Sequence, residues 1–346
     1  MKLPGRREWG WATFFFLLLI LGIYSPVILS ERNFAGRDLL VYHLPIEKAV
    51  HEAYSHRRLP IWIPEISGGR PLAPNPNVGA FYPIRPLLAQ FSFPAAMRIF
   101  PILHWAIAGV GMILLLRSVR ASLGAAWLAG VTYAFSGPAV TEVFYPNIQP
   151  GMTLLPWVVW AVNRRNVSGG MKLLTLSLLF ALLYLAGDVF TIGIAILCGF
   201  LWILVERIAA ERVAELILLG LGLLLAGLLA APQVVATALW VSDTNRAVLG
   251  MKLADSLAFS VSPLRLVELV IPFPFGPTWE LDDSRIWGWP VFQARTIGFF
   301  TTLYSGAFCV IALTSRRWRA PGSRFARILF SVALLLSVAP NFLPDA

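Results

Sequence analysis

The side chains best suited to chemistry lie in the polar stretch that follows the first hydrophobic segment. Between Ser30 and Met97 are five of the 18 acidic residues and three of the four histidines. Asp38 stands near the start of this stretch. A carboxylate that is partly desolvated near a membrane can act as a general base, because its pKa is raised. Asp38 is therefore the candidate catalytic base, and a helix N-cap paired with Arg37 is the alternative.

Arginines in the polar segments are candidates for binding a phosphate group. The guanidinium fork binds two oxygens at once, which suits a phosphate better than the point charge of lysine does. Arg37 and Arg70 lie in the first polar stretch, and Arg246 lies in a later one. Arg98 is expected where a hydrophobic segment begins, and a side chain that only reaches toward the interface is the alternative there.

Four further ionisable residues could take part in a site. His43 follows Asp38 by about one helical turn and could orient the base or bind phosphate, unless it is a plain surface histidine. Asp188 sits in a tight connection between two apolar segments, where an acid is costly without a role; turn formation is the alternative. Glu142 is a weaker case of the same kind. His104 lies inside an apolar segment, where either function or neutral packing would explain it.

The carboxylates do not form a recognisable metal motif. Asp38, Glu142, Asp188 and the pair at 282–283 could supply oxygen ligands to a divalent ion, but their spacing is not diagnostic. The sequence also has no Walker loop, dinucleotide fingerprint or zinc motif. We therefore predict no cofactor: a divalent metal stays possible but is not predicted, and nucleotide-dependent chemistry is not expected.

Composition places the chain among membrane proteins with several spans. Of its 346 residues 58% are hydrophobic and 13% are charged, with a mean hydropathy of +0.72, whereas about a quarter of the residues of a soluble domain are charged. We attribute the net charge of +10 to basic residues that fix the membrane orientation of the chain, and not to a surface that binds nucleic acid. Cys198 and Cys309 fall in apolar segments, so we expect packing residues and no disulfide.

We predict an all-α polytopic membrane protein, a single transmembrane domain over 1–346 with about nine spans. The first apolar segment has no small-residue cleavage site and is expected to be a retained helix. The spans are expected at 11–30, 96–116, 123–141, 150–163, 171–187, 189–206, 213–236, 296–315 and 324–340.

The distribution of Lys and Arg predicts a cytoplasmic N-terminus. With that orientation every short inner connection is basic, whereas the short outer connections near Glu142 and Asp188 contain no Lys or Arg. Only short loops count in the positive-inside rule. The orientation also puts 14 of the 18 acidic residues outside or at the outer membrane edge.

Two long outer loops are expected, at 31–95 and 238–294. The first should hold two short helices that lie on the membrane, at 39–56, where the apolar spacing is amphipathic, and at 78–91. Between them, 61–77 is so rich in Pro and Gly that we expect no regular structure. A loop of this kind beside packed helices is a typical binding surface.

The motifs of the chain follow a recognisable order. The first loop contains Arg37-Asp38, His43-Leu44-Pro45, Arg58-Leu59-Pro60-Ile61-Trp62-Ile63-Pro64, Ser67-Gly68-Gly69-Arg70-Pro71-Leu72, Asn75-Pro76-Asn77 and Phe81-Tyr82-Pro83. Downstream lie Tyr133-Ala134-Phe135-Ser136-Gly137, Leu155-Pro156-Trp157, Ala186-Gly187-Asp188, Ala231-Pro232-Gln233 and Asn245-Arg246. Over almost its whole length the chain resembles the bacterial YfhO-type membrane proteins. It departs from them at Arg58, Ile63 and Val189, where Gly, Asn and Pro are usual, and its relatives are typically longer.

The YfhO-type proteins in turn resemble the GT-C glycosyltransferases, multi-span enzymes that take a sugar from a polyprenyl-phosphate carrier on the outer face of the membrane. The resemblance implies a GT-C-like first loop in the bacterial inner membrane, with Asp38 as the general base. The expected partners are a polyprenyl-phosphate-linked sugar and an acceptor glycan, lipid or protein of the cell envelope. Arg37, His43, Arg70, Asp188 and Arg246 would then contact the substrate.

Two other functions compete with this expectation. A transporter or flippase for a lipid-linked glycan would place ionisable residues along a path through the bilayer, and apart from His104 the predicted span interiors contain almost none. A non-catalytic assembly factor, or a truncated relative, would fit a chain shorter than the other members of the family.

Overall fold

A computed structural model describes residues 6–165, 167–250, 260–276, 288, 300–306 and 322–338. In these ranges the chain is mostly helical, and four helices are long and apolar enough to cross a membrane. They are α5 (Phe93–Ser118), α9 (Gly169–Ala186), α10 (Val189–Glu206) and α11 (Ala209–Leu229). The architecture is all-α and consistent with a membrane protein. Nine spans are not established.

Three of the predicted spans each match one long helix closely. The spans at 96–116, 171–187 and 189–206 correspond to α5, α9 and α10, respectively. A predicted span at 150–163 corresponds to the shorter α8 (Gln149–Asn163), and one at 324–340 to α16 (Ser323–Val338). The predicted span at 296–315 falls largely outside the described residues, and its described part, 300–306, contains no helix.

Three other predicted spans are each divided into two helices. The segment 11–30 becomes α1 (Arg6–Ile23) and α2 (Ser25–Ile28), and 123–141 becomes α6 (Leu123–Ala134) and α7 (Gly137–Thr141). The segment 213–236 becomes α11 and α12 (Ala231–Trp240). Each second helix has a proline in its first turn. A proline there costs the second helix no hydrogen bond, but its missing N–H prevents the backbone hydrogen bonds from continuing from the first helix into the second.

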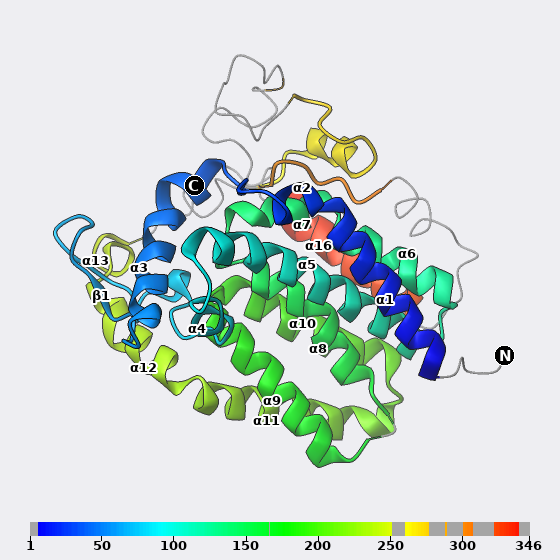
Figure 1. The fold of residues 1–346 in the computed structure, drawn as a ribbon. Coiled ribbons are helices and arrows are strands. Elements are labelled where there is room, and N and C mark those ends of the chain that lie inside the picture. Colours follow the sequence, from blue (N-terminus) through cyan, green and yellow to red (C-terminus); the bar gives the residue numbers. More distant parts are fainter. Residues whose placement is uncertain are drawn as a thin grey trace.

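The helices pack into one bundle (Figure 1), and the two largest apolar cores of the described residues lie among different sets of helices. One core lies among α8, α9, α10 and α11, with fully buried side chains such as Phe180 and Ile203. The other joins α1, α5 and α6 around Phe16 and Trp105. Glycines permit the close contacts: a Cβ on Gly109 of α5 would overlap the ring of Phe16. Small residues at such crossings are how apolar helices approach one another in a membrane.

The first loop is more ordered than its composition predicts. The expected helix at 39–56 is present as the π-helix η1 (Leu39–His43) followed by α3 (Leu44–Ser55). The one expected at 78–91 shortens to α4 (Ile84–Leu88). Residues 61–77, predicted to be irregular, contain an antiparallel pair, β1 (Trp62–Ile63) with β2 (Arg70–Pro71), and the 3-10 turn η2 (Pro76–Val78). That prediction was wrong because a two-residue pairing tolerates the flanking prolines.

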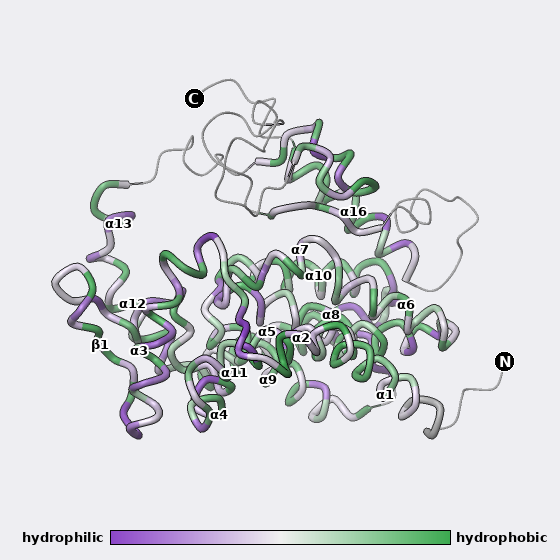
Figure 2. Tube along the Cα trace, turned by 45° about the horizontal axis from the view of Figure 1, so that its top comes forward, coloured by the Kyte–Doolittle hydropathy of each residue, from purple (hydrophilic) through white to green (hydrophobic). Residues whose placement is uncertain are grey.

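The first loop packs directly on the turn between α9 and α10. Gly79 and Gly187 both have positive φ, +57° and +95°. A Cβ on Gly187 would overlap the Pro76 carbonyl oxygen, and one on Gly79 would lie 2.6 Å from the Ala186 oxygen. From the other side, Gln233 Nε2 of α12 donates to the Ala73 carbonyl at 2.9 Å. In Figure 2 hydrophilic colour gathers along α3, β1 and α4, and the bundle helices are mainly hydrophobic.

At the opposite end of α9 the short basic connections meet. Lys172 Nζ contacts the Glu215 carboxylate at 2.7 Å, and Arg207 contacts the same group at 3.7 Å. Arg165 lies 3.5 Å from Glu211. We call this the basic end. The end that carries the first loop, the segment 142–148 and the α9–α10 turn is called the loop end.

The described parts of the second long loop contain three short helices besides the end of α12. They are η4 (Val241–Asp243), α13 (Asn245–Leu249) and η5 (Pro263–Leu269). In η5, Arg265 and Glu268 form a buried two-bond ion pair at 2.7 and 2.8 Å. Glu268 also accepts the backbone N–H of Leu303 at 3.0 Å, which ties η5 to 300–306.

Replacing Gly187 with alanine should weaken the attachment of the first loop. The added Cβ overlaps the Pro76 carbonyl and the backbone is left-handed, so we expect a loss of at least about 2 kcal/mol in the free energy of unfolding. Thermal unfolding in detergent micelles measures this. Gly193→Ala on α10 is the matched control, since its Cβ meets nothing within 4 Å. Equal effects of the two substitutions would contradict the assignment.

Candidate functional site

Several of the candidate side chains meet around two tyrosines at the loop end. The guanidinium of Arg37 lies 5.9 Å from the ring centre of Tyr145. The ring of His43 is 6.4 Å from the same ring and 4.9 Å from that of Tyr42. Arg70 lies 5.5 Å from the ring of Tyr42. Arg37, His43 and Arg70, predicted from scattered positions, therefore form one cluster, which we call the arginine–tyrosine cluster.

Asp38 lies beside this cluster with its side chain exposed. It occupies the N-cap position of η1 but accepts no capping hydrogen bond, so the alternative of a helix cap lacks the bond that would define it. Burial raises the pKa of the Tyr145 hydroxyl to about 12, while Arg37 lowers it and Asp38 raises it. Both charges thus lie close to Tyr145.

A strained turn sets the position of Asp38. Gly36 has φ +142°, and a Cβ there would come within 2.9 Å of the Phe144 ring. Arg37 has φ +44°, a left-handed conformation that is uncommon for a residue other than glycine. Residues held in such conformations cluster at functional sites because the surrounding structure must enforce them. Here the enforcing contacts come from Phe144 and Tyr145.

His43 is 5% exposed, so it is not a surface histidine. Burial, together with the positive charge of Arg85, lowers the pKa of its imidazole to about 4. The ring is therefore neutral near pH 7. In that state it can donate one hydrogen bond and accept another, but it cannot neutralise a phosphate.

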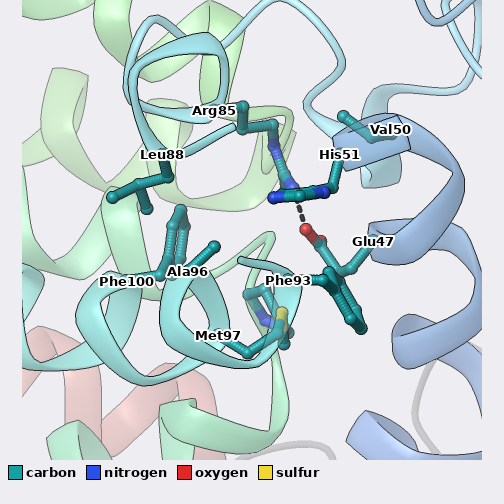
Figure 3. Close-up of a pocket in the computed structure, with 10 residues that line it drawn as sticks. Glu47, Val50, His51, Arg85, Leu88, Phe93, Ala96, Met97 and Phe100 are labelled. Atoms are coloured by element: carbon teal, nitrogen blue, oxygen red, sulfur yellow. Dashed lines mark hydrogen bonds and ion pairs between the residues drawn. The ribbon is translucent and has the colours of Figure 1, made fainter. Parts of the chain in front are cut away.

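An ion pair that the sequence did not single out lies behind the cluster. Glu47 of α3 and Arg85 of α4 form a hydrogen-bonded salt bridge, and their side chains are only 10% and 5% exposed (Figure 3). The Arg85 guanidinium also stacks 5.6 Å from the centre of the Phe100 ring. One signal could have revealed it: Glu47 falls on the apolar side of the amphipathic pattern of 39–56.

The Glu47–Arg85 pair borders a small cavity of about 30 Å³, walled mainly by apolar side chains such as Phe93 and Met97. This is room for one or two water molecules, whereas ligand pockets are typically about ten times larger or more. Asp38 does not line it. The cavity is therefore part of the packing of the first loop and not the site of a substrate.

His104 is fully buried and satisfied. Its Nδ1 lies 2.7 Å from the Phe100 carbonyl, which can only accept, so Nδ1 carries the proton. Nε2 then accepts from the Tyr82 hydroxyl at 3.0 Å. Both ring nitrogens are used in fixing Tyr82 of the first loop to α5. Of the two interpretations of His104, this geometry favours neutral packing.

Two buried acidic residues lie at the loop end, near enough for the charge of Asp188 to affect Glu142. Asp188 caps α10: its carboxylate accepts the Phe190 N–H at 3.1 Å, the Thr191 N–H at 3.3 Å and the Thr191 hydroxyl. Glu142, in the 3-10 turn η3 (Glu142–Phe144), is 2% exposed. Burial, and then the charge of Asp188, raise the pKa of the Glu142 carboxyl well above its usual value.

The remaining candidates lie apart from the cluster. Arg246 is exposed on α13, and no contact within the described ranges joins it to Asp38 or Tyr145. Arg98 is half-buried in the first turns of α5. Among the residues that the structure describes, no group of three His, Cys, Asp or Glu side chains is arranged to hold a metal ion.

Comparisons with known proteins give no match: no family model, no curated protein and no solved structure is similar to this chain at a significant level. The resemblance to YfhO-type proteins therefore stays a prediction that rests on the motifs. What the structure adds is their placement, since Asn75-Pro76-Asn77, Ala186-Gly187-Asp188 and Ala231-Pro232-Gln233 come together at the loop end.

Removing one partner of the Glu47–Arg85 pair should be strongly destabilising. Arg85→Met leaves a buried carboxylate without a partner, which costs about 3–5 kcal/mol, whereas the double variant Glu47→Leu/Arg85→Met should recover most of that loss. Chemical unfolding in detergent measures both. Lys48→Met tests the exposed Lys48–Glu52 pair at 3.8 Å and should cost no more than about 0.5 kcal/mol. A double variant as unstable as Arg85→Met would contradict this interpretation.

His43 should make the protein less stable in acid. Because its folded pKa, about 4, lies below the unfolded value of about 6.5, the unfolded chain binds the proton more readily. Stability is therefore full above pH 6.5 and falls by up to about 3 kcal/mol as the pH drops to 4. Unfolding midpoints measured across this range should decline less in His43→Gln than in the unmodified protein. His56→Gln, at an exposed position, is the control and should leave the slope unchanged.

Proposed function

We propose that this chain is a GT-C-type glycosyltransferase of the bacterial inner membrane, with its N-terminus in the cytoplasm and its loop end on the outer face. It would move a sugar from a polyprenyl-phosphate donor to an acceptor glycan, lipid or protein of the envelope. The observation that carries the proposal is an exposed carboxylate, Asp38, next to Arg37, which is held over the Tyr145 ring. Arg70 lies over the Tyr42 ring of the same arginine–tyrosine cluster.

In the proposed reaction Asp38 takes the proton of the acceptor hydroxyl as the hydroxyl oxygen attacks the anomeric carbon. The bond from that carbon to the carrier phosphate breaks, and the phosphate leaves with the electron pair. Arg37 and Arg70 would stabilise the charge that develops on the phosphate oxygens. Neutral His43 would orient the site by hydrogen bonding. Asp188 and Arg246 would not act in the same way as these three residues. Asp188 already caps α10, and Arg246 would reach the substrate only from α13.

The distribution of ionisable side chains favours a reaction at the loop end, and not transport of a substrate through the helix bundle. A transporter needs ionisable groups along its path. In the described helices, His104 is used for packing, and the ion pairs of Lys172 and Arg207 lie at the basic end. The basic end would face the cytoplasm under the positive-inside rule, which leaves the arginine–tyrosine cluster on the outer side.

Asp38→Asn tests the proposal, because the amide keeps the shape of the side chain and removes the base. In the native host we expect transfer to fall by about 10²–10⁴-fold, read as loss of a glycan or glycolipid from the envelope profile at unchanged protein level. Asp243→Asn, an exposed acid in η4, is the matched control. An unchanged profile in Asp38→Asn would refute the enzyme and favour a non-catalytic role.

A further inference from the structure

The least satisfied charge-bearing group at the loop end is Glu142. Its side chain is 2% exposed, and within the described chain its Oε1 atom is buried with no hydrogen-bond partner. On the same segment Asn147 Oδ1 is also buried and unpartnered. Burying an ionised carboxylate without a partner is very costly, and most buried polar atoms in proteins are satisfied. An unpartnered oxygen of this kind calls for a ligand.

The ligand that fits these oxygens is a proton. A metal ion needs several ligands, and the described residues offer no group of three suitable side chains. A proton needs only one oxygen. Asp188 supplies the second carboxylate, whose oxygens accept three hydrogen bonds from Phe190 and Thr191. The two environments thus differ: Asp188 accepts three hydrogen bonds, whereas Glu142 Oε1 accepts none from the residues described and is the oxygen suited to hold a proton.

Both acids lie directly beneath the points where the first loop touches the bundle. Asp188 follows Gly187, which abuts the Pro76 carbonyl. Glu142 begins η3, and Phe144 of the same turn abuts Gly36. Loss of the proton would place two negative charges together in this buried floor, with no Lys or Arg of the described chain paired to Glu142.

We propose that Glu142 and Asp188 form a proton-binding pair that fastens the first loop to the helix bundle. The site is independent of the glycosyltransferase proposal, because Glu142 has no part in that reaction and Asp188 enters it only as the cap of α10. While Glu142 is protonated, the turns at Pro76–Gly79 and Gly36 stay docked. When it ionises, repulsion between the carboxylates loosens both contacts.

The other titratable groups around the pair would not produce the same pH dependence. Tyr133 of α6 interacts with Glu142 but donates its hydroxyl proton to the Met152 carbonyl at 2.7 Å. Next to η3, Tyr145 contacts Arg37 and His43 and lies near Asp38. His43 affects stability only toward acid. The Glu142 effect has the opposite sign, because a folded state that keeps a proton longer loses stability as the pH rises.

The experiment compares the full chain with Glu142→Gln, which imitates the protonated acid, in detergent micelles. Above the unfolded value of about pH 4.3, the unfolding temperature of the unmodified protein should fall, relative to that of Glu142→Gln, by about 2 °C per pH unit until Glu142 ionises. At fixed alkaline pH, amide exchange over 72–82 should be faster in the unmodified protein. Glu52→Gln, at an exposed position, should behave as the unmodified protein does.

An infrared measurement on the unmodified protein covers the case in which Glu142→Gln does not fold. At neutral pH we expect the carbonyl band of a protonated carboxylic acid, absent in Glu142→Gln and kept in Asp188→Asn. The proposal is overturned if that band is missing from the unmodified protein, or if the unfolding temperatures of the two proteins run parallel with pH.

Discussion

The first loop depends on one buried ion pair. Glu47 and Arg85 lie on different helices and are 38 residues apart, and their pairing fixes α3 against α4 over the start of α5. Taking both charges out of water costs several kcal/mol per ion, so the pair specifies a geometry more than it adds stability. The pair also acts on its surroundings: burial lowers the pKa of the nearby His43, and the charge of Arg85 lowers it further.

The loop is joined to the bundle by contacts between backbones. Gly187 and Gly79 let the turn at Pro76–Gly79 approach the end of α9 closely, and Gln233 holds the Ala73 carbonyl from α12. Tyr82 is anchored on His104. These contacts come from three different helices, α9, α12 and α5. A site at the loop end therefore requires the whole bundle, because no single segment could hold the loop in place.

This arrangement separates two kinds of acid. Asp38 is exposed beside positive charge, where it can meet an acceptor, and it is the residue proposed as a base. Glu142 and Asp188 are buried under the loop, where a proton and not a substrate is the natural ligand. The proposed reactive surface around Asp38 and the proposed pH-sensitive pair of Glu142 and Asp188 can thus belong to one structure, provided that the contacts between them are short and rigid.

The sequence alone determined the apolar helices, the amphipathic helix after Asp38 and the clustering of short basic connections, because all three follow from local periodicity and composition. It also selected Arg37, His43 and Arg70, which the fold brings together. Only the tertiary structure decided that His43 is buried, that Glu47 meets Arg85, and that Glu142 lies with Asp188 beneath the loop, apart from Arg246. Such pairings join residues far apart in the chain, so their energy depends on packing and desolvation, which no spacing along the sequence encodes.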